Sequence, residues 1–269
     1  MKRNAIVPLF FLVSLTLFSC NKIDSLFSNG KPVTESRNLD SVFSAICMYN
    51  NISVELVQSN QPHIELTCPE NLIDKITTTV ESGSLIIRNE NNFNWLRSYD
   101  YECNMKVFYD SIDQIDYASN GKLIARDSLR GIAVPDTLKD ISGNDSLVVM
   151  KRTFNLNISE GSGDMDLTFS CDILHDGFSN GTATVTLKGK AGYAEHLLKS
   201  YGKLDARDLN TNLATIQSNS TNDAYVWART RLKVEINSIG NVYFKGNPYI
   251  ERHIHGDGNI YPLERLAPL

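Results

Sequence analysis

The sequence predicts an all-β fold, a right-handed parallel β-helix built from coils of about 20 residues. The first observation behind this prediction is a recurring turn residue, spaced by 18 to 22 residues if Ser220 fills one gap. The recurring residues are Gly121, Gly143, Gly161, Gly181, Gly202, Gly240 and Gly258. Because stacked coils place each turn on the turn below, the same local geometry is demanded every time, and glycine tolerates positive φ and close backbone approach.

The second observation is that the residues on either side of this turn residue also recur along the chain. A serine often precedes it by two residues, where its hydroxyl can hydrogen-bond the turn: Ser119, Ser159, Ser179, Ser200, Ser218 and Ser238. An apolar residue follows it by four: Ala125, Leu147, Met165, Val185, Ala206, Ala224 and Phe244. We expect these apolar residues to point inward and to form one continuous column.

The third observation is the period-two alternation of apolar residues, as in Met165-x-Leu167-x-Phe169. Such runs, bounded by Gly, Asn, Asp and Ser, predict short strands with one buried face. Propeller blades need about 40 residues, and no leucine-rich consensus is present. Seven or eight coils are therefore expected between residues 105 and 262, and residues 69–76 are the best candidate for a helix.

The chain divides into four predicted parts. Residues 1–19 resemble a lipoprotein signal peptide, because Lys2 and Arg3 precede a short apolar run that is too short to span a membrane. Residues 20–36 are polar and are expected to form a tether. Residues 37–104 are expected to be an N-terminal β region that caps the solenoid, with strands at 43–49, 51–57 and 63–68. Residues 105–269 would form the β-helix and its C-terminal cap.

Cys20 is the predicted lipidation site. The segment Leu17-Phe-Ser-Cys20 resembles a bacterial lipobox, in which the cysteine is lipidated and becomes the new N-terminus. The alternative is an ordinary cleaved secretion signal. Acyl chains would hold the protein on a membrane, and Asn21 after the cysteine favours the outer membrane, facing the periplasm or the surface.

The charge balance excludes some partners. The chain has 26 Lys and Arg against 31 Asp and Glu, a net charge of −5. This balance argues against nucleic acid and against an anionic membrane surface as partners, so a lipid anchor would be the contact with the membrane.

The remaining cysteines are Cys47, Cys68, Cys103 and Cys171. Their spacing matches no metal-binding pattern, and three of them lie on the apolar side of alternating runs. They are interpreted as small buried hydrophobes. A disulfide also fits an oxidising envelope, but the sequence does not choose its pairing.

Several segments together resemble one known family. They are Phe43-x-x-Ile46, Ile52–Gln58, Pro69–Leu72, Thr79–Ile87 and Gly161-Ser-Gly-Asp164, followed by the recurring glycine turns. Over about residues 37–262 the chain resembles the putative auto-transporter adhesin, head-GIN-domain family, envelope proteins that are common in Bacteroidetes and often lipoproteins. The resemblance implies a β-helical fold. It implies no role for particular residues.

No cofactor or metal site is expected. His253 and His255 share a strand face near Asp257, but two imidazoles do not complete a metal site. Asp164 and Asp166 also share a face, without the tandem glycine–aspartate repeats of calcium-binding rolls.

No catalytic residue is assigned. Lys122, Arg126 and Asp127 repeat as Lys203, Arg207 and Asp208, 81 residues apart. Four coils would separate them by ~19 Å, which is too far for one active site. The motif Gly177-Phe-Ser179-Asn-Gly181 fits a nucleophile elbow, but a strand rather than a helix follows it.

The first functional hypothesis is a non-catalytic envelope module that binds a glycan or a protein. The alternative is a β-helical polysaccharide lyase or hydrolase, which three or more charged side chains within ~8 Å in a groove would favour. A third interpretation is a purely structural envelope component. Exposed aromatic residues in a row, such as Tyr225, Trp227 and Tyr243, would favour sugar binding instead.

Overall fold

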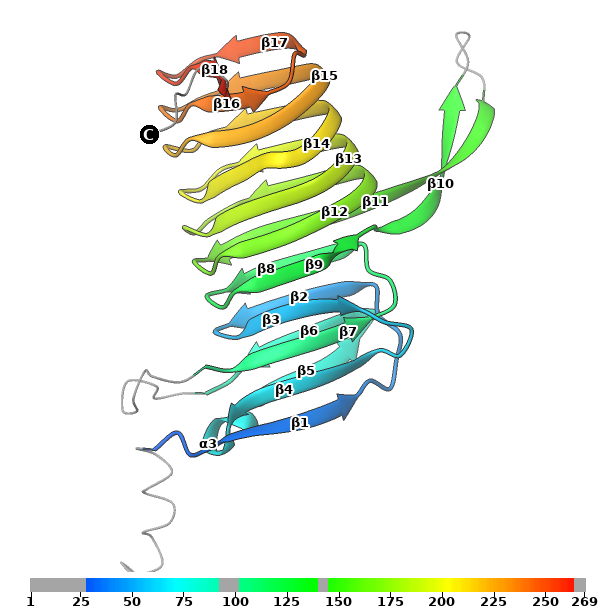
Figure 1. Cartoon of the computed structure of the whole chain (residues 1–269), viewed down its shortest axis with the longest axis vertical. Coiled ribbons are helices and arrows are strands. Elements are labelled where there is room, and N and C mark those ends of the chain that lie inside the picture. The colour runs from blue at the N-terminus through cyan, green and yellow to red at the C-terminus, as the bar shows by residue number, and fades with distance from the viewer. Residues whose placement is uncertain (1–27, 92–101, 140–144, 264–269) are drawn as a thin grey trace, which may run out of the picture.

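The computed structural model describes residues 28–91, 102–139 and 145–263. These residues are mostly β-strand, and the one helix among them is α3 (Glu70–Ile73), within the predicted helical segment. The strands lie along one curled sheet, with β1 at one end and β17 and β18 at the other (Figure 1).

The strands of the first half are β1 (Pro32–Asn38), β2 (Ala45–Asn50), β3 (Ser53–Gln58), β4 (His63–Pro69), β5 (Ile76–Glu81), β6 (Ser84–Asn89), β7 (Asn104–Tyr109), β8 (Gln114–Ser119) and β9 (Leu123–Leu129). Those of the second half are β10 (Ile132–Lys139), β11 (Asp145–Gly161), β12 (Met165–Phe178), β13 (Thr184–Leu198), β14 (Lys203–Ser218), β15 (Ala224–Ile236), β16 (Val242–Lys245), β17 (Tyr249–Ile254) and β18 (Ile260–Pro262). The first strand begins inside the segment expected to be the tether.

The predicted fold class, a right-handed parallel β-helix, is wrong. The described residues form a single sheet of 18 strands whose orientation is mixed. The pairs β1–β4, β4–β7, β5–β6 and β10–β11 are antiparallel, whereas β2–β8, β3–β9 and the pairs from β11 to β18 are parallel. The fold is therefore a curled mixed sheet.

Local turn chemistry explains one of the antiparallel pairs. Strands β5 and β6 are joined by Ser82 and Gly83, whose φ angles are 50° and 79°. Two successive residues with positive φ form the tight turn that matches the twist of a β-hairpin. The chain therefore reverses at this point instead of entering another parallel strand.

The second departure from the prediction is the arm formed by β10 and β11. The recurring sequence pattern placed a coil around Gly143, which lies outside the described residues. Strand β10 instead pairs antiparallel with the first half of β11, and the two project from the sheet (Figure 1). Gly131, with a φ of 72°, precedes the arm, and a Cβ there would lie 2.3 Å from Thr153 O. The second half of β11 then rejoins the sheet between β8 and β12.

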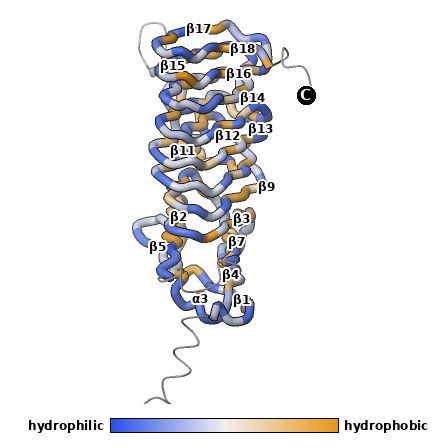
Figure 2. The backbone as a smooth tube through the Cα atoms, turned by 90° about the vertical axis from the view of Figure 1, so that its left-hand side faces the viewer, coloured by the Kyte–Doolittle hydropathy of each residue, from blue (hydrophilic) through white to orange (hydrophobic). Residues whose placement is uncertain are grey.

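The core lies between the two halves of each bent strand. Apolar and polar residues alternate along much of the chain (Figure 2), and alternate strand positions are buried, as along β12. Met165 is 2% exposed, Val185 is 0% exposed and Phe244 is 9% exposed, so these three recurring apolar residues are buried. Burial of alternate side chains on successive strands supplies the main driving force for this fold.

The turn residues occupy two positions rather than one. A Cβ on Gly181 would lie 2.2 Å from Gly161 O, whereas a Cβ on Gly202 would lie 2.9 Å from Ala183 O, two residues further along the turn. Gly181 has a φ of 103° because its turn contains one extra residue, and Gly202 needs only the space. The register agrees, since Val185 pairs with Leu204 and not with Ala206.

Candidate binding surfaces

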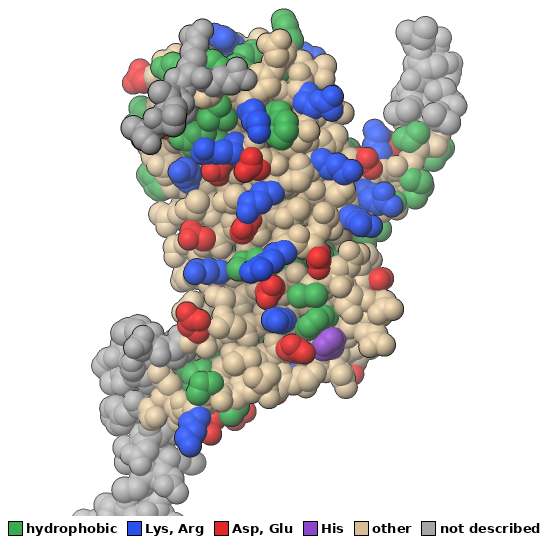
Figure 3. Space-filling model, viewed as in Figure 1, with side chains coloured by type: hydrophobic (Ala, Val, Ile, Leu, Met, Phe, Trp, Pro, Cys, Tyr) green, Lys and Arg blue, Asp and Glu red, His purple; other side chains and the backbone are tan. Residues whose placement is uncertain are grey.

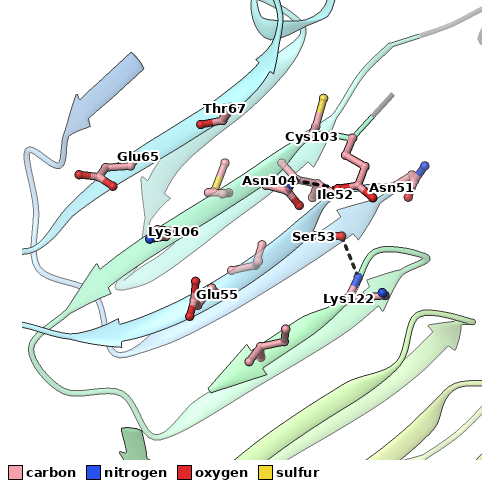
Figure 4. A pocket seen from close by; sticks show the side chains of 14 residues that line it. Asn51, Ile52, Ser53, Glu55, Glu65, Thr67, Cys103, Asn104, Lys106 and Lys122 are labelled. Carbon is pink, nitrogen blue, oxygen red and sulfur yellow. Dashed lines mark hydrogen bonds between the residues drawn. The ribbon is translucent and has the colours of Figure 1, made fainter. Parts of the chain in front are cut away.

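One hollow, here called the N-terminal groove, has a volume of about 470 Å³. It lies on the outer face of β3, β4, β7 and β9 (Figure 4). Its outward side chains include Glu55, Glu65, Thr67, Asn104, Lys106 and Lys122. Charged groups, amides and hydroxyls thus line it, and together they can donate and accept hydrogen bonds.

Three charges in the N-terminal groove form a row across adjacent strands. Lys106 on β7 is paired in register with Glu55 on β3 and with Glu65 on β4. Opposite charges on neighbouring strands attract each other, so this row also stabilises the sheet. The two carboxylates are two strand spacings apart, or about 9.6 Å between backbones. This backbone spacing slightly exceeds the ~6.5–9.5 Å that separates the two carboxyl groups of inverting glycosidases.

Two of the three aromatic residues suggested by the sequence, Tyr225 and Tyr243, form a row with Tyr261, whereas Trp227 lies beside Lys245. Tyr225 stacks on Tyr243 with ring centroids 5.1 Å apart, and Tyr243 lies 5.6 Å from Tyr261. The guanidinium of Arg207 lies 4.2 Å from the Tyr225 centroid, and Lys245 Nζ lies 4.0 Å from that of Trp227. The ring faces are therefore largely occupied by protein groups. Tyr261, at the end of the row, is 43% exposed, so part of its ring is accessible to a sugar.

A second hollow, here called the bend groove, lies where strands β12 to β15 bend. Its volume is about 420 Å³. Arg152, Lys190 and Arg229 line it together with Asp172 and two asparagines. Backbone N of Arg152 donates a hydrogen bond of 2.8 Å to Asp172 Oδ2. The lining of the bend groove therefore has an excess of positive charge, whereas that of the N-terminal groove does not.

The charged motif that begins at Lys122 and its repeat that begins at Lys203 lie closer together than predicted, but still too far apart to form one site. Strands β9, β12, β13 and β14 are successive neighbours, so Lys122 and Lys203 are three strand spacings apart, about 14 Å. The arm adds residues between the two motifs but no strand between β9 and β12. The distance is therefore three strand spacings instead of the four predicted. Arg126 lies 3.9 Å from Glu55, and Arg207 lies 2.7 Å from Asp205.

The other residues considered from the sequence lie apart from the two grooves. His253 Nε2 lies 3.2 Å from Glu251 Oε1, and Asp166 forms an ion pair with Lys188. Within residues 28–91, 102–139 and 145–263, no three His, Cys, Asp or Glu side chains gather in a possible metal site. Ser179 follows β12, is exposed and precedes β13, so no helix continues from it. Cys20 lies outside the described residues.

The cysteines resolve into one disulfide and two thiols. Cys68 and Cys103 are bonded, with a Cα–Cα distance of 4.4 Å. Cys47 and Cys171 are free. Burial, together with the nearby charge of Asp172, raises the pKa of the Cys171 thiol to about 12. This thiol therefore stays protonated at neutral pH and is a poor nucleophile.

A buried polar pair was missed from the sequence. Asp176 on β12 and His196 on β13 face the core, where apolar residues surround them. The available signal was that both polar residues stand at inward positions of an alternating run, as in Leu174-x-Asp176-x-Phe178. The pair lines neither groove, so its contribution is to the core.

A family model, "Putative auto-transporter adhesin, head GIN domain", matches residues 42–248, most of the chain. The chain belongs to this family. The match confirms the resemblance found in the sequence, and head GIN domain proteins form an adhesin-like class associated with the cell envelope. No curated protein matches the chain.

Solved structures of other bacterial proteins share the fold of this head GIN domain protein. A putative adhesin from Bacteroides fragilis has a TM-score of 0.71 and 17% identity, covering 88% of this chain and 100% of its own. A putative lipid binding protein from Parabacteroides distasonis has a TM-score of 0.62 and 20% identity, covering 88% and 99%. A putative adhesin from Parabacteroides merdae has a TM-score of 0.57 and 22% identity, covering 88% and 98%.

The described residues were also compared with the requirements of a membrane-spanning helix. Among them, no helix combines the length and the hydropathy that a transmembrane span needs.

Proposed function

We propose that this protein is a non-catalytic binding module of the cell envelope that is anchored through lipid on Cys20 and binds a glycan or protein partner. The observation that carries the proposal is the polar N-terminal groove of about 470 Å³. Family membership supports the adhesin-like class, and the groove supports a site for it.

The chemistry of the groove suits a ligand rich in hydroxyl groups. The carboxylates of Glu55 and Glu65 accept hydrogen bonds, whereas Lys106 and the amide of Asn104 donate them. A sugar hydroxyl both donates and accepts, so each can meet one of these groups. Ile124 adds an apolar contact at the edge of the groove.

A glycan array together with a pull-down from envelope extracts tests the binding function. Replacing Glu55→Gln and Lys106→Gln should weaken binding of the captured ligand by about tenfold, since charge-assisted hydrogen bonds are lost. The control replaces Asp166→Asn and Lys188→Gln, an outward ion pair of 2.7 Å that does not line the groove. Equal losses in both double variants would contradict this site.

The anchor has its own test. Wild-type protein should incorporate a labelled fatty acid in a producing bacterium, and Cys20→Ser should not. Unlabelled wild-type protein would contradict the anchor and leave the binding function standing.

The second candidate function is hydrolysis of a polysaccharide in the same groove. The observation behind it is that two carboxylates, Glu55 and Glu65, lie in one groove on either side of Lys106. Release of reducing sugar from a bound polysaccharide, abolished by Glu65→Gln, would support this function. Binding without release supports the non-catalytic module.

A further inference from the structure

A small hollow at the foot of the β10–β11 arm is lined in part by a tyrosine whose buried hydroxyl has no partner among the described residues. Its volume is about 180 Å³, and Tyr109 is among the residues that line it. Tyr109 is 3% exposed, and its hydroxyl has no hydrogen-bond partner among the described residues. Burial first, and then the charge of Asp127, raise the pKa of this phenol to about 12, while Arg130 lowers it. The hydroxyl is therefore a proton donor that lacks an acceptor, and leaving it so is costly.

Two arginines share the hollow with Tyr109. Arg130 and Arg152 both line it, and Arg152 also lines the bend groove, so the two hollows adjoin at this side chain. The bend groove adds Lys190 and Arg229. Lys and Arg side chains gather on the edge of the molecule from which the arm leaves (Figure 3).

Among the described residues, these four cations, Arg130, Arg152, Lys190 and Arg229, have no ion-pair partner, whereas Lys151 in the arm is paired with Asp136. Two acids, Asp110 and Asp172, also line the hollows. Asp172 accepts a hydrogen bond from a backbone amide rather than from a cationic side chain. The combined surface thus has an excess of positive charge within a chain of net charge −5.

Part of the lining of the bend groove consists of small residues. Ser170, Cys171, Ala191 and Gly192 lie there, with Asp172 beside Gly192, where a Cβ would come within 2.7 Å of Asp172 O. The cations from Arg152 on β11 to Arg229 on β15 span four strand spacings, about 19 Å. The surface is therefore long enough for several units of a polymer.

We propose that the foot of the arm and the bend groove form one binding surface for an acidic polysaccharide, with a carboxylate or sulfate group held by the Tyr109 hydroxyl, Arg130 and Arg152. This inference rests on the proposed binding function and names a ligand class for it at a second surface. Arginine and a hydroxyl donor provide the charge-assisted hydrogen bonds that oxyanions prefer. Lys190 and Arg229 meet further acidic units.

The lining residues favour a glycan over a nucleic acid. Seryl hydroxyls and the amides of Asn210 and Asn212 can bind sugar hydroxyls. Proteins that bind single-stranded nucleic acid stack bases on exposed aromatic rings. The only aromatic ring that lines either hollow among the described residues is Tyr109, which is buried.

Binding of purified protein to polygalacturonate, dextran sulfate and neutral dextran tests the proposal, with calorimetry as the readout. We expect one or both acidic polymers to bind and neutral dextran not to bind. Arg152→Gln should weaken binding by about tenfold, and Tyr109→Phe, which removes only the hydroxyl, by a few fold. Arg252→Gln is the matched control, because this exposed arginine on β17 lines neither hollow.

Each other outcome overturns the proposal. No binding of either acidic polymer, equal weakening by Arg152→Gln and Arg252→Gln, or equally tight binding of a single-stranded oligonucleotide would do so. A glycan array that returns neutral ligands sensitive to Glu55→Gln with Lys106→Gln, but not to Arg152→Gln, would contradict this inference and retain the proposed function. Circular dichroism of each variant verifies that the fold is intact.

Discussion

His196 Nδ1 lies 2.6 Å from Asp176 Oδ2, and the side chains are 1% and 0% exposed, respectively. The two residues face each other on neighbouring parallel strands, in the register that pairs Asp176 with His196. Asp176 Oδ1 has no hydrogen-bond partner among the described residues. A polar pair of this kind is a stability risk, because each group depends on the other for its compensation.

Removing one member of this pair should destabilise the protein strongly. Asp176→Leu or His196→Leu leaves the remaining group buried without its partner, at an expected cost of about 3–5 kcal/mol. The double variant should recover much of this loss, since two apolar residues replace both polar groups. Urea unfolding of the three variants measures the coupling. Losses that simply add in the double variant would show that the two residues do not compensate each other.

Gly181→Val should destabilise by about 2 kcal/mol or more, because valine tolerates neither a φ of 103° nor a Cβ 2.2 Å from Gly161 O. The matched control is Gly177→Val. Its Cβ would meet no atom within 4 Å, and valine suits the strand in which it lies. Urea midpoints should separate the two variants. Equal midpoints would mean that the geometry of the turn at Gly181 contributes little.

Phe244→Ala should cost about 3–5 kcal/mol, the usual range for truncation of a buried phenylalanine. Phe244 is 9% exposed and pairs with Val226 on the preceding strand. Tyr249→Ala removes a ring of similar size that is 71% exposed, and it should change stability little. Thermal unfolding of both variants provides the comparison, and a small loss for Phe244→Ala would contradict its place in the core.

Replacing Cys68 and Cys103 together by alanine should lower stability by about 2–4 kcal/mol. The disulfide closes a segment with a sequence separation of 35, so its removal frees the unfolded chain. Cys171→Ala, which removes a buried thiol and no bond, is the control. Urea unfolding without reductant measures both variants, and wild-type protein with reductant should behave like the double variant. A double variant as stable as wild type would contradict a structural role for the bond.

Strand positions and the buried faces followed from the sequence because alternation reports directly on which side chain points inward. Met165, Val185 and Phe244 are buried as expected, and strands occur near 43–49, 51–57 and 63–68. Strand direction did not follow. Apolar residues alternate in the same way in parallel and antiparallel strands. The turn at Ser82 and Gly83 therefore did not overturn the prediction of parallel strands that the glycine repeat had suggested.

The sequence also did not predict which turn glycines occupy equivalent positions. Aligning glycine with glycine merged Gly181 and Gly202 into one position, although a one-residue insertion shifts the first turn. Gly143 matched the spacing but lies outside the described residues. Similarly, the cations of the two hollows lie on separate strands and at different sequence spacings, so only the fold brings Arg130, Arg152 and Arg229 to one edge.

The β10–β11 arm marks a place where segments of this sheet can be inserted or replaced. Leu123 on β9 pairs with Met165 on β12, and Gln114 on β8 pairs with Asn155 on β11, so the sheet keeps its register across the excursion of β10 and the first half of β11. The excursion therefore behaves as an insertion between two strands that already fit together. The same junction is a natural place for exchange of whole segments between relatives, and for grafting a foreign hairpin, because the core on either side is complete without the arm.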